Sequence, residues 1–399
     1  MNKYINNYFT LLFCLVPLSI ILGPTVSLVN IILIDFSFII LLIYLKDFSF
    51  LKKNTLVYFY ILFIYLLFNS LISIDPSINL GRNLGFIRII IFFLAFNYFF
   101  NVNFFYKKVF LVWFLIVSIV VFDIFFENFF GRNILGFKSE FYGRNVSFFK
   151  DEYIVGGYLY GLYLILIGYL FDKYGTKHKK FIILFSLILL IAIISTGERS
   201  NSIKALISLV IFYTIILNVS VRKKLLSIIF GLILIAGFIS SSESLKLRFY
   251  DQIKAMATGN NYYFTIYNSG FEVFKRYPFF GVGNKNYRVE TCEKFEELKE
   301  IYICTTHPHQ IYIEFLSEHG LVGTIFLLFI FYKLIFSKII MVIKNRSCLQ
   351  LSALIYLVLI FLPLLPSGAF FSDYMMTFFA LNISILYATN SKTNIFINK

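Results

Sequence analysis

The chain has 399 residues, of which 59% are hydrophobic, 20% aromatic and only 14% charged. Soluble domains carry about 25% charged residues, so this composition excludes a soluble globule and predicts an all-α polytopic membrane protein. The net charge of +15 does not indicate a nucleic-acid partner, because no run of lysine and arginine is long enough. No small-residue cleavage site follows the first apolar run, so we expect that run to stay as a helix.

Apolar runs of membrane-spanning length follow one another along the chain, and we predict about twelve transmembrane helices in a single membrane domain, 1–399. The predicted spans are 8–23, 26–45, 55–73, 84–100, 109–126, 153–171, 181–195, 203–219, 225–241, 310–336, 349–364 and 372–389.

Lysine and arginine are divided unevenly between the loops. Those at 46–53, 107–108, 173–180 and 222–224 fall on the same side as both chain ends, and the short loops of the other side hold fewer. By the positive-inside rule the richer side is cytoplasmic, so we expect both termini in the cytoplasm.

Two outer segments are too long to be simple connectors. The smaller one is about 127–152, and the larger one, 242–308, is the main loop outside the membrane. The larger segment should hold a second helix at about 262–276. Its start has an apolar face typical of a helix in the headgroup plane, made by Leu245, Phe249, Ile253 and Met256.

Two arginines have positions that indicate a function at the outer boundary. Thr196–Asn201 joins two apolar runs, so Arg199 must lie at the membrane edge, where an ionisable residue is costly without a partner. A snorkelling arginine or a salt bridge to Glu198 is the structural alternative. Arg248 lies on the amphipathic stretch, where contact with lipid headgroups is the commoner use.

Three of the chain's four histidines lie in the stretch 306–323. Pro308 fits the first turn of a helix, with His307 or Thr306 as the N-cap, which would place His309 in the opening turn. The positive end of the helix dipole disfavours an imidazolium there, so His309 should be neutral and able to accept a proton. The structural alternative is a histidine that only caps a helix at the water interface.

His309, Arg199 and Arg248 should therefore share the outer face, a set that suits an anionic lipid-linked substrate because guanidinium groups bind phosphate oxygens bidentately. Other basic residues of the same loop are expected to be mostly solvated surface: Lys275, Arg276, Lys285 and Arg288.

Cys292 and Cys304 share the larger outer loop and are predicted to form a disulfide, if that compartment is oxidising. A zinc site made with His307 and His309 is the alternative, but the spacing fits no familiar ligand pattern, so no metal is expected. Phe280–Gly283 is predicted to form a turn, because it is too short for a phosphate-binding loop.

The same residues resemble the O-antigen ligase and polymerase superfamily. Its signature is a histidine followed by Asn, Ser or Gln, nine residues, and Gly-x-x-Gly, Thr or Tyr. His309-Gln310, Ile311–His319 and Gly320 to Gly323 fit this signature without a gap. Tyr277–Gly283, with Gly281 and Gly283, is similar to the family's Pro-hydrophobic-hydrophobic-Gly-x-Gly stretch. The resemblance covers about 195–385, with Arg199 and Arg248 at the positions of the family's arginines.

The resemblance implies glycan transfer without metal or cofactor, in a bacterial inner membrane with the active site facing the periplasm. The donor would be a polysaccharide on undecaprenyl pyrophosphate. The acceptor would be a lipid A core hydroxyl in a ligase, or another lipid-linked repeat unit in a polymerase. His309 would be the base or positioning group, and Arg199 and Arg248 would hold the pyrophosphate. Glu314 and Glu318 are expected to be structural.

Two other classes compete with a transferase. A multi-span transporter would suit the number of spans, but the polar residues gather at one face and not at the midplane. A sensor or scaffold whose outer loop binds a partner would leave His309 free to vary.

Overall fold

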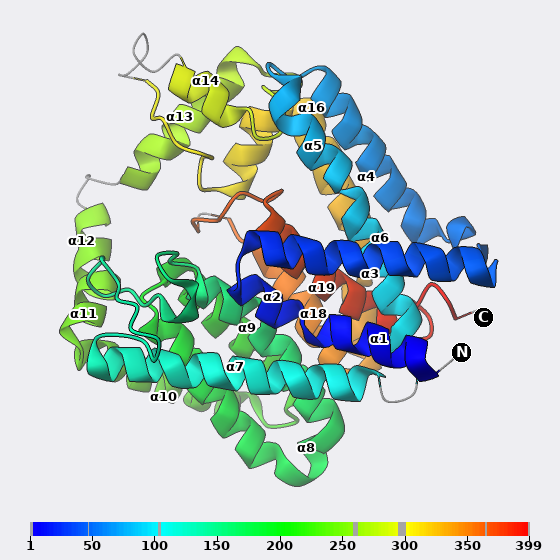
Figure 1. Ribbon diagram of the computed structural model, residues 1–399. Helices are drawn as coiled ribbons and strands as arrows, with labels where there is room; N and C mark the ends of the chain where they lie inside the picture. Colours follow the sequence, from blue (N-terminus) through cyan, green and yellow to red (C-terminus); the bar gives the residue numbers. More distant parts are fainter. Residues whose placement is uncertain are drawn as a thin grey trace.

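The computed structural model describes residues 3–46, 48–102, 105–257, 262–293, 301–363 and 365–397, and the side chains of all of these except 49 and 255–257. Within this part all the regular secondary structure is helical and no strand occurs, as predicted (Figure 1). The predicted position of the Met256 side chain lies outside the described residues.

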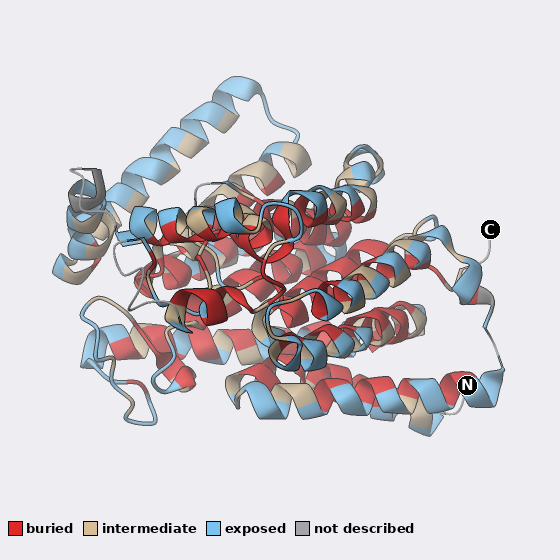
Figure 2. Ribbon diagram, turned by 90° about the horizontal axis from the view of Figure 1, so that it is seen from above, coloured by how far each residue is buried: buried red, intermediate tan, exposed pale blue. Residues whose placement is uncertain are grey.

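Nine of the described helical segments are long and apolar enough to cross a membrane. They are α1 with α2 (Lys3–Cys14, Val16–Ile21), α3 (Pro24–Leu45), α4 (Asn54–Leu71), α5 with α6 (Pro76–Gly85, Ile87–Phe100), α7 (Phe105–Phe130), α8 (Val155–Ser195), α9 (Arg199–Ile216), α10 (Val221–Ser240) and α16 with α17 (Ile311–Leu334, Ile339–Asn345). Two shorter helices follow, α18 (Cys348–Ile360) and α19 (Asp373–Ala388). The start of α1 and the segment after α19 lie at the same end of the bundle in both views (Figures 1 and 2).

The 41-residue helix α8 turns back on itself. A straight helix of this length would hold its ends about 60 Å apart. In the fold, the Gly156 N–H near its start donates to the Glu198 carboxylate just after its end, at 2.7 Å. The helical geometry is broken at His178 (φ −119°, ψ 24°), between the predicted spans 153–171 and 181–195. The bend thus separates two of the predicted spans. Each predicted span overlaps a described helix, and the number of membrane crossings stays a prediction.

Aromatic side chains fill much of the core. The rings of Phe9 and Phe99 stack 4.2 Å apart, and Phe13 meets Phe105 edge-on at 5.3 Å. In lipid the hydrophobic effect between helices is weak, so close ring packing supplies attraction that burial alone would not. α10 is the opposite case: none of its residues is buried, and it lies along the outside as a pale ribbon (Figure 2).

The segment predicted as the larger outer loop, 242–308, is mostly helical in its described residues. The predicted second helix is present with the expected bounds as α13, whereas the amphipathic stretch is interrupted by a π-helical turn. The sulfur atoms of Cys292 and Cys304 are joined in a disulfide. The elements of this segment are α11 (Glu243–Lys246), the π turn η3 (Leu247–Asp251), α12 (Gln252–Ala257), α13 (Tyr262–Arg276) and α14 (Tyr287–Glu293). Elsewhere in the chain there are single 3-10 turns at η1 (Ser49–Lys52), η2 (Ser147–Phe149) and η4 (Phe336–Lys338).

The smaller outer segment starts later than expected, because α7 continues to Phe130. The loop after it folds back on the end of α7. Both carboxylate oxygens of Glu127 accept backbone N–H groups, from Val146 at 3.0 Å and Ser147 at 2.7 Å. This anchoring fixes the loop that carries Arg144.

Candidate active site

A cavity of about 850 Å³ lies among α8, α9, α18, α19 and the loop before α16. This volume is near the upper end of the range of about 300–1,000 Å³ that is usual for ligand cavities. Its lining combines two histidines with cations, acids and tyrosines. These are His307, His309, Arg82, Arg144, Lys150, Lys204, Lys285, Arg288, Asp151, Glu152, Glu198, Asp373, Tyr153, Tyr160, Tyr263, Tyr356 and Tyr374.

His309 lies just before α16 and not inside its first turn, so the predicted start of this helix is wrong. The helix begins at Ile311 and its N-cap is Gln310, whose side-chain oxygen accepts the Ile313 N–H at 2.9 Å. The glutamine side chain supplies the same kind of acceptor as the usual serine or threonine cap. Because the helix begins after this cap, Pro308 lies outside it. His309 instead has a left-handed backbone (φ 54°), which turns the chain and aims its ring into the cavity.

The rings of His307 and His309 lie 4.0 Å apart. His307 is fixed on both sides: Nε2 is 3.2 Å from the Ser367 carbonyl, and Nδ1 is 2.9 Å from the Thr306 hydroxyl. Because a carbonyl can only accept, Nε2 must carry the proton and Nδ1 must accept from the hydroxyl. The Ser367 N–H also donates to the His309 carbonyl at 2.9 Å, which ties the histidine stretch to the loop before α19.

Both imidazoles are held neutral. Burial lowers the pKa of His307 to about 4, and the neighbouring His309 adds to the shift. Burial also lowers the pKa of His309 below its usual 6.5, opposed in part by the Ser367 carbonyl. At neutral pH His309 therefore has an unprotonated ring nitrogen beside the cavity, which is the state a general base needs.

The glycine motifs dock against each other beside a break in α16. Within α16 the backbone breaks at Gly320 (φ 64°, ψ −172°), and the segment 278–283 docks against this break. Four backbone hydrogen bonds join the two: Leu321 and Val322 donate to the carbonyls of Pro278 and Phe279, and Val282 and Gly283 donate to those of Ser317 and Glu318, at 2.8–3.1 Å.

This docking requires glycine at two of the motif positions. A Cβ at Gly320 would overlap the backbone of Phe279 and Phe280, and one at Gly281 would overlap that of Glu318 and His319. Both residues also have positive φ angles that disfavour other residues. The two glycine motifs, about 40 residues apart in the sequence, are therefore the two halves of one contact.

Arg144 is the arginine that lines the cavity next to the predicted arginine loop. It lies 3.8 Å from Glu198 and donates to the Tyr153 carbonyl at 2.7 Å. The Glu198 carboxylate is occupied by the start of α8, where the N–H groups of Gly156 and Gly157 donate to its two oxygens at 2.7 and 3.1 Å. Glu198 therefore caps α8, and its pairing with Arg144 is loose.

Arg199 and Arg248 are not among the described residues that line the cavity, but Arg248 lies near Arg144. Arg248 donates to the Gly197 carbonyl at 3.2 and 3.3 Å. Burial first, and then the nearby Arg199 and Arg144, lower the pKa of Arg248 to about 10, so Arg248 lies close to both of these guanidinium groups. The ring of Tyr263 is 6.2 Å from that of His309, and Tyr263 also acts on the pKa of Arg248. Tyr263 therefore lies near both the histidine pair and the arginines.

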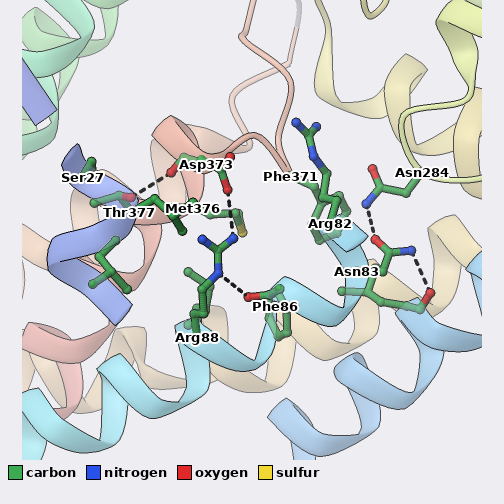
Figure 3. A pocket seen from close by; sticks show the side chains of 15 residues that line it. Ser27, Arg82, Asn83, Phe86, Arg88, Asn284, Phe371, Asp373, Met376 and Thr377 are labelled. Atoms are coloured by element: carbon green, nitrogen blue, oxygen red, sulfur yellow. Dashed lines mark hydrogen bonds and ion pairs between the residues drawn. The ribbon is translucent and has the colours of Figure 1, made fainter. Parts of the chain in front are cut away.

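A small polar pocket adjoins the cavity around α5. Arg88 bonds Asp373 at 3.0 Å, and the Asn284 amide donates to Asn83, which holds α5 against the loop after Gly283 (Figure 3). The Arg82 guanidinium points away from both pairs, and no ion pair of Arg82 is formed with the described residues (Figure 3). Arg82 is thus a further cation that faces the cavity.

The disulfide also bears on the zinc alternative. With Cys292 and Cys304 joined, neither sulfur can act as a thiolate ligand. No group of three or more metal-binding side chains occurs in the part of the chain that the structure describes. The residues present around His307 and His309 thus supply two nitrogen ligands, which fall short of the usual four for structural zinc.

Sequence reasoning missed Arg82 and Lys204 as cavity residues and treated Lys285 and Arg288 as surface. Arg82 and Lys204 lie on helices flanked by apolar residues on several sides, so periodicity does not reveal which face meets the cavity. An unusual lysine or arginine within a membrane-spanning run was the available signal.

Comparison with known proteins gives one family. Residues 184–328 match the family model described as O-antigen ligase, a range that includes Arg199, Arg248, His309 and the Gly320 to Gly323 motif. A search of curated proteins gave no match. Over residues 184–328 the chain is therefore similar to the O-antigen ligase family.

Proposed function

We propose that the chain is a membrane glycosyltransferase of the O-antigen ligase type. It would move a polysaccharide from undecaprenyl pyrophosphate to a lipid A core hydroxyl at the periplasmic face of the bacterial inner membrane, with both termini in the cytoplasm. The observation that supports this best is the neutral imidazole of His309, which faces a large cavity lined by arginines. The proposed reaction uses no metal or cofactor.

In this proposal His309 is the base. Its unprotonated ring nitrogen accepts the proton of the acceptor hydroxyl, whose oxygen forms a bond to the anomeric carbon of the donor sugar. The bond from that carbon to the carrier diphosphate breaks, and the electron pair leaves with the diphosphate. His307, fixed by Ser367 and Thr306, supports the ring of His309 and keeps it from swinging out of the cavity.

The leaving diphosphate gains charge in this step and needs cations fixed in place beforehand. Arg144 supplies a guanidinium at the cavity from the loop after α7, and Arg248 lies close to Arg144 and Arg199. Arginine suits this role because its fork binds two phosphate oxygens and stays charged. The proximity of Tyr263 to His309 and its influence on Arg248 support a site that the charge and the base share.

The test is transfer by the purified full chain in nanodiscs, supplied with carrier-linked glycan and lipid A core. The wild type should glycosylate the core, and His309→Ala should lose at least about 100-fold of the rate, the usual size of a general-base effect. His178→Ala is the matched control, because His178 is exposed in the bend of α8.

Replacing the core with carrier-linked repeat units separates the polymerase alternative, which would lengthen the chains on the carrier lipid. Transfer by His309→Ala at the wild-type rate would remove His309 from the mechanism. Movement of a lipid-linked glycan across the bilayer without any transfer would instead place the chain among transporters.

A further inference from the structure

Lys204 is a buried cation that has no partner among the described residues. It lies in α9, lines the cavity and is only 5% exposed. Its ammonium forms no hydrogen bond or ion pair with the residues that the structure describes, although each of its three hydrogens is a donor. A charge left in this state inside a membrane helix is costly unless an anion joins it.

The position of Lys204 relative to the histidines follows from the contacts of α9. Ser200, in the first turn of this helix, donates to the Pro366 carbonyl, and the next residue, Ser367, holds His307. Lys204 is four residues after Ser200, so it lies on the same face about 6 Å further along the helix axis. Both residues line the cavity. The backbone of Lys204 is therefore about one helical turn further along α9 than Ser200, whose contact with Pro366 lies next to the residue that holds His307.

A second unpartnered donor faces the same cavity. Tyr160 of α8 is also 5% exposed, and the Ser208 hydroxyl near it donates instead to the Lys204 carbonyl, so the Tyr160 hydroxyl makes no hydrogen bond of normal geometry within the described part of the chain. Tyr163, one turn away, donates to the carbonyl of Ala205, the neighbour of Lys204. This contact fixes the two helices so that Tyr160 and Lys204 reach the cavity from adjacent walls.

We propose that Lys204 and the Tyr160 hydroxyl join the arginines in binding the diphosphate of a polyprenyl-linked donor, at the end of the cavity between α8 and α9. The inference rests on the proposed function, because it names the part of the donor that this end would hold. Phosphate oxygens accept from both groups, and their negative charge compensates the ammonium. Apolar lining beside them, from Ile360 and Phe378, suits the first units of the prenyl chain.

The test measures binding directly. The full chain in phosphatidylcholine nanodiscs is titrated with geranylgeranyl diphosphate. Lys204→Met should weaken binding about tenfold to 100-fold, because hydrogen bonds to charged groups are lost, and Lys204→Arg should keep most of the affinity. Tyr160→Phe should weaken it about threefold to tenfold. Lys223→Met, an exposed lysine on α10, is the matched control and should bind as the wild type does.

A merely structural role for Lys204 predicts a different pattern. In our proposal the unliganded Lys204→Met protein is at least as heat-stable as the wild type, because an uncompensated charge is removed, while its stabilisation by the diphosphate falls. Loss of stability in both Lys204→Met and Lys204→Arg would overturn the proposal, and so would unchanged binding by Lys204→Met.

Two further titrations identify the source of the phosphate and separate the two proposals. Phosphatidylglycerol that binds through Lys204 and is not displaced by the diphosphate would make this a headgroup site and overturn the inference. His309→Ala should still bind the diphosphate. If the diphosphate binds through Lys204 but the wild type transfers no glycan, only the proposed function is contradicted. If the wild type transfers glycan but binding does not depend on Lys204, only this inference is contradicted.

Discussion

Replacing Gly320 with alanine tests the docking of the glycine motifs. The backbone of Gly320 lies in a region that is nearly restricted to glycine, so an alanine there costs on the order of 1–3 kcal/mol. The added Cβ would also overlap the backbone of Phe279 and Phe280, and overpacking of this kind costs about 1–3 kcal/mol more. The total, roughly 2–6 kcal/mol, is a large part of the stability of about 5–15 kcal/mol that is usual for folded proteins.

The measurement is the thermal unfolding midpoint of the purified variant, where each kcal/mol corresponds to roughly 2 °C for a chain of this size. Gly231→Ala is the control, because a Cβ at this position of α10 meets no atom within 4 Å and alanine favours a helix. Gly323→Ala should fall between the two, since the Tyr65 hydroxyl that it would meet can move. Equal midpoints for Gly320→Ala and Gly231→Ala would refute the docking.

Three further predictions concern Gln310, His307 and the disulfide. Gln310→Ala should destabilise α16 by about 1 kcal/mol through loss of its N-cap and slow transfer by misplacing His309, and Gln310→Ser should restore both; equal rates for the three proteins would contradict this. His307 binds protons more weakly when folded, so stability should fall as pH drops from 6.5 to about 4, by up to roughly 3 kcal/mol more in the wild type than in His307→Gln, measured by unfolding at each pH. Cys292→Ser with Cys304→Ser should cost about 3 kcal/mol for a loop of 12 residues, and a reductant should destabilise only the wild type.

The fold could be predicted from sequence because long apolar runs have few alternatives in a membrane. The predicted spans coincide with helices, and even the split of α8 was visible as a basic break around His178. The start of α16 was mispredicted because a proline usually marks the first turn, whereas Gln310 supplied a cap two residues later. Local propensity does not record which of two possible caps the tertiary fold selects.

The candidate site was accessible to sequence reasoning in part. The histidine and the glycines are adjacent in motifs, so their roles were visible, but the arginines come from loops far apart in the chain. Arg199 and Arg248 were named for their places at the membrane edge, yet Arg144 is the one that lines the cavity beside them. The docking of the 127–152 segment onto Gly197 brings Arg144 there, and that long-range contact left no periodic pattern in the sequence.

The central claim is that a neutral His309 takes the proton of the acceptor hydroxyl. The most direct measurement is the pH dependence of the transfer rate under saturating donor and acceptor, for the wild type and His309→Ala. Because the pKa of His309 is lowered from 6.5, the wild-type rate should be constant at neutral pH and fall only below that value as the imidazole protonates. The transfer rate of His309→Ala should be low and should not decrease further at acidic pH. A wild-type rate that increases as the pH decreases, or an equal rate in the variant, would contradict the account.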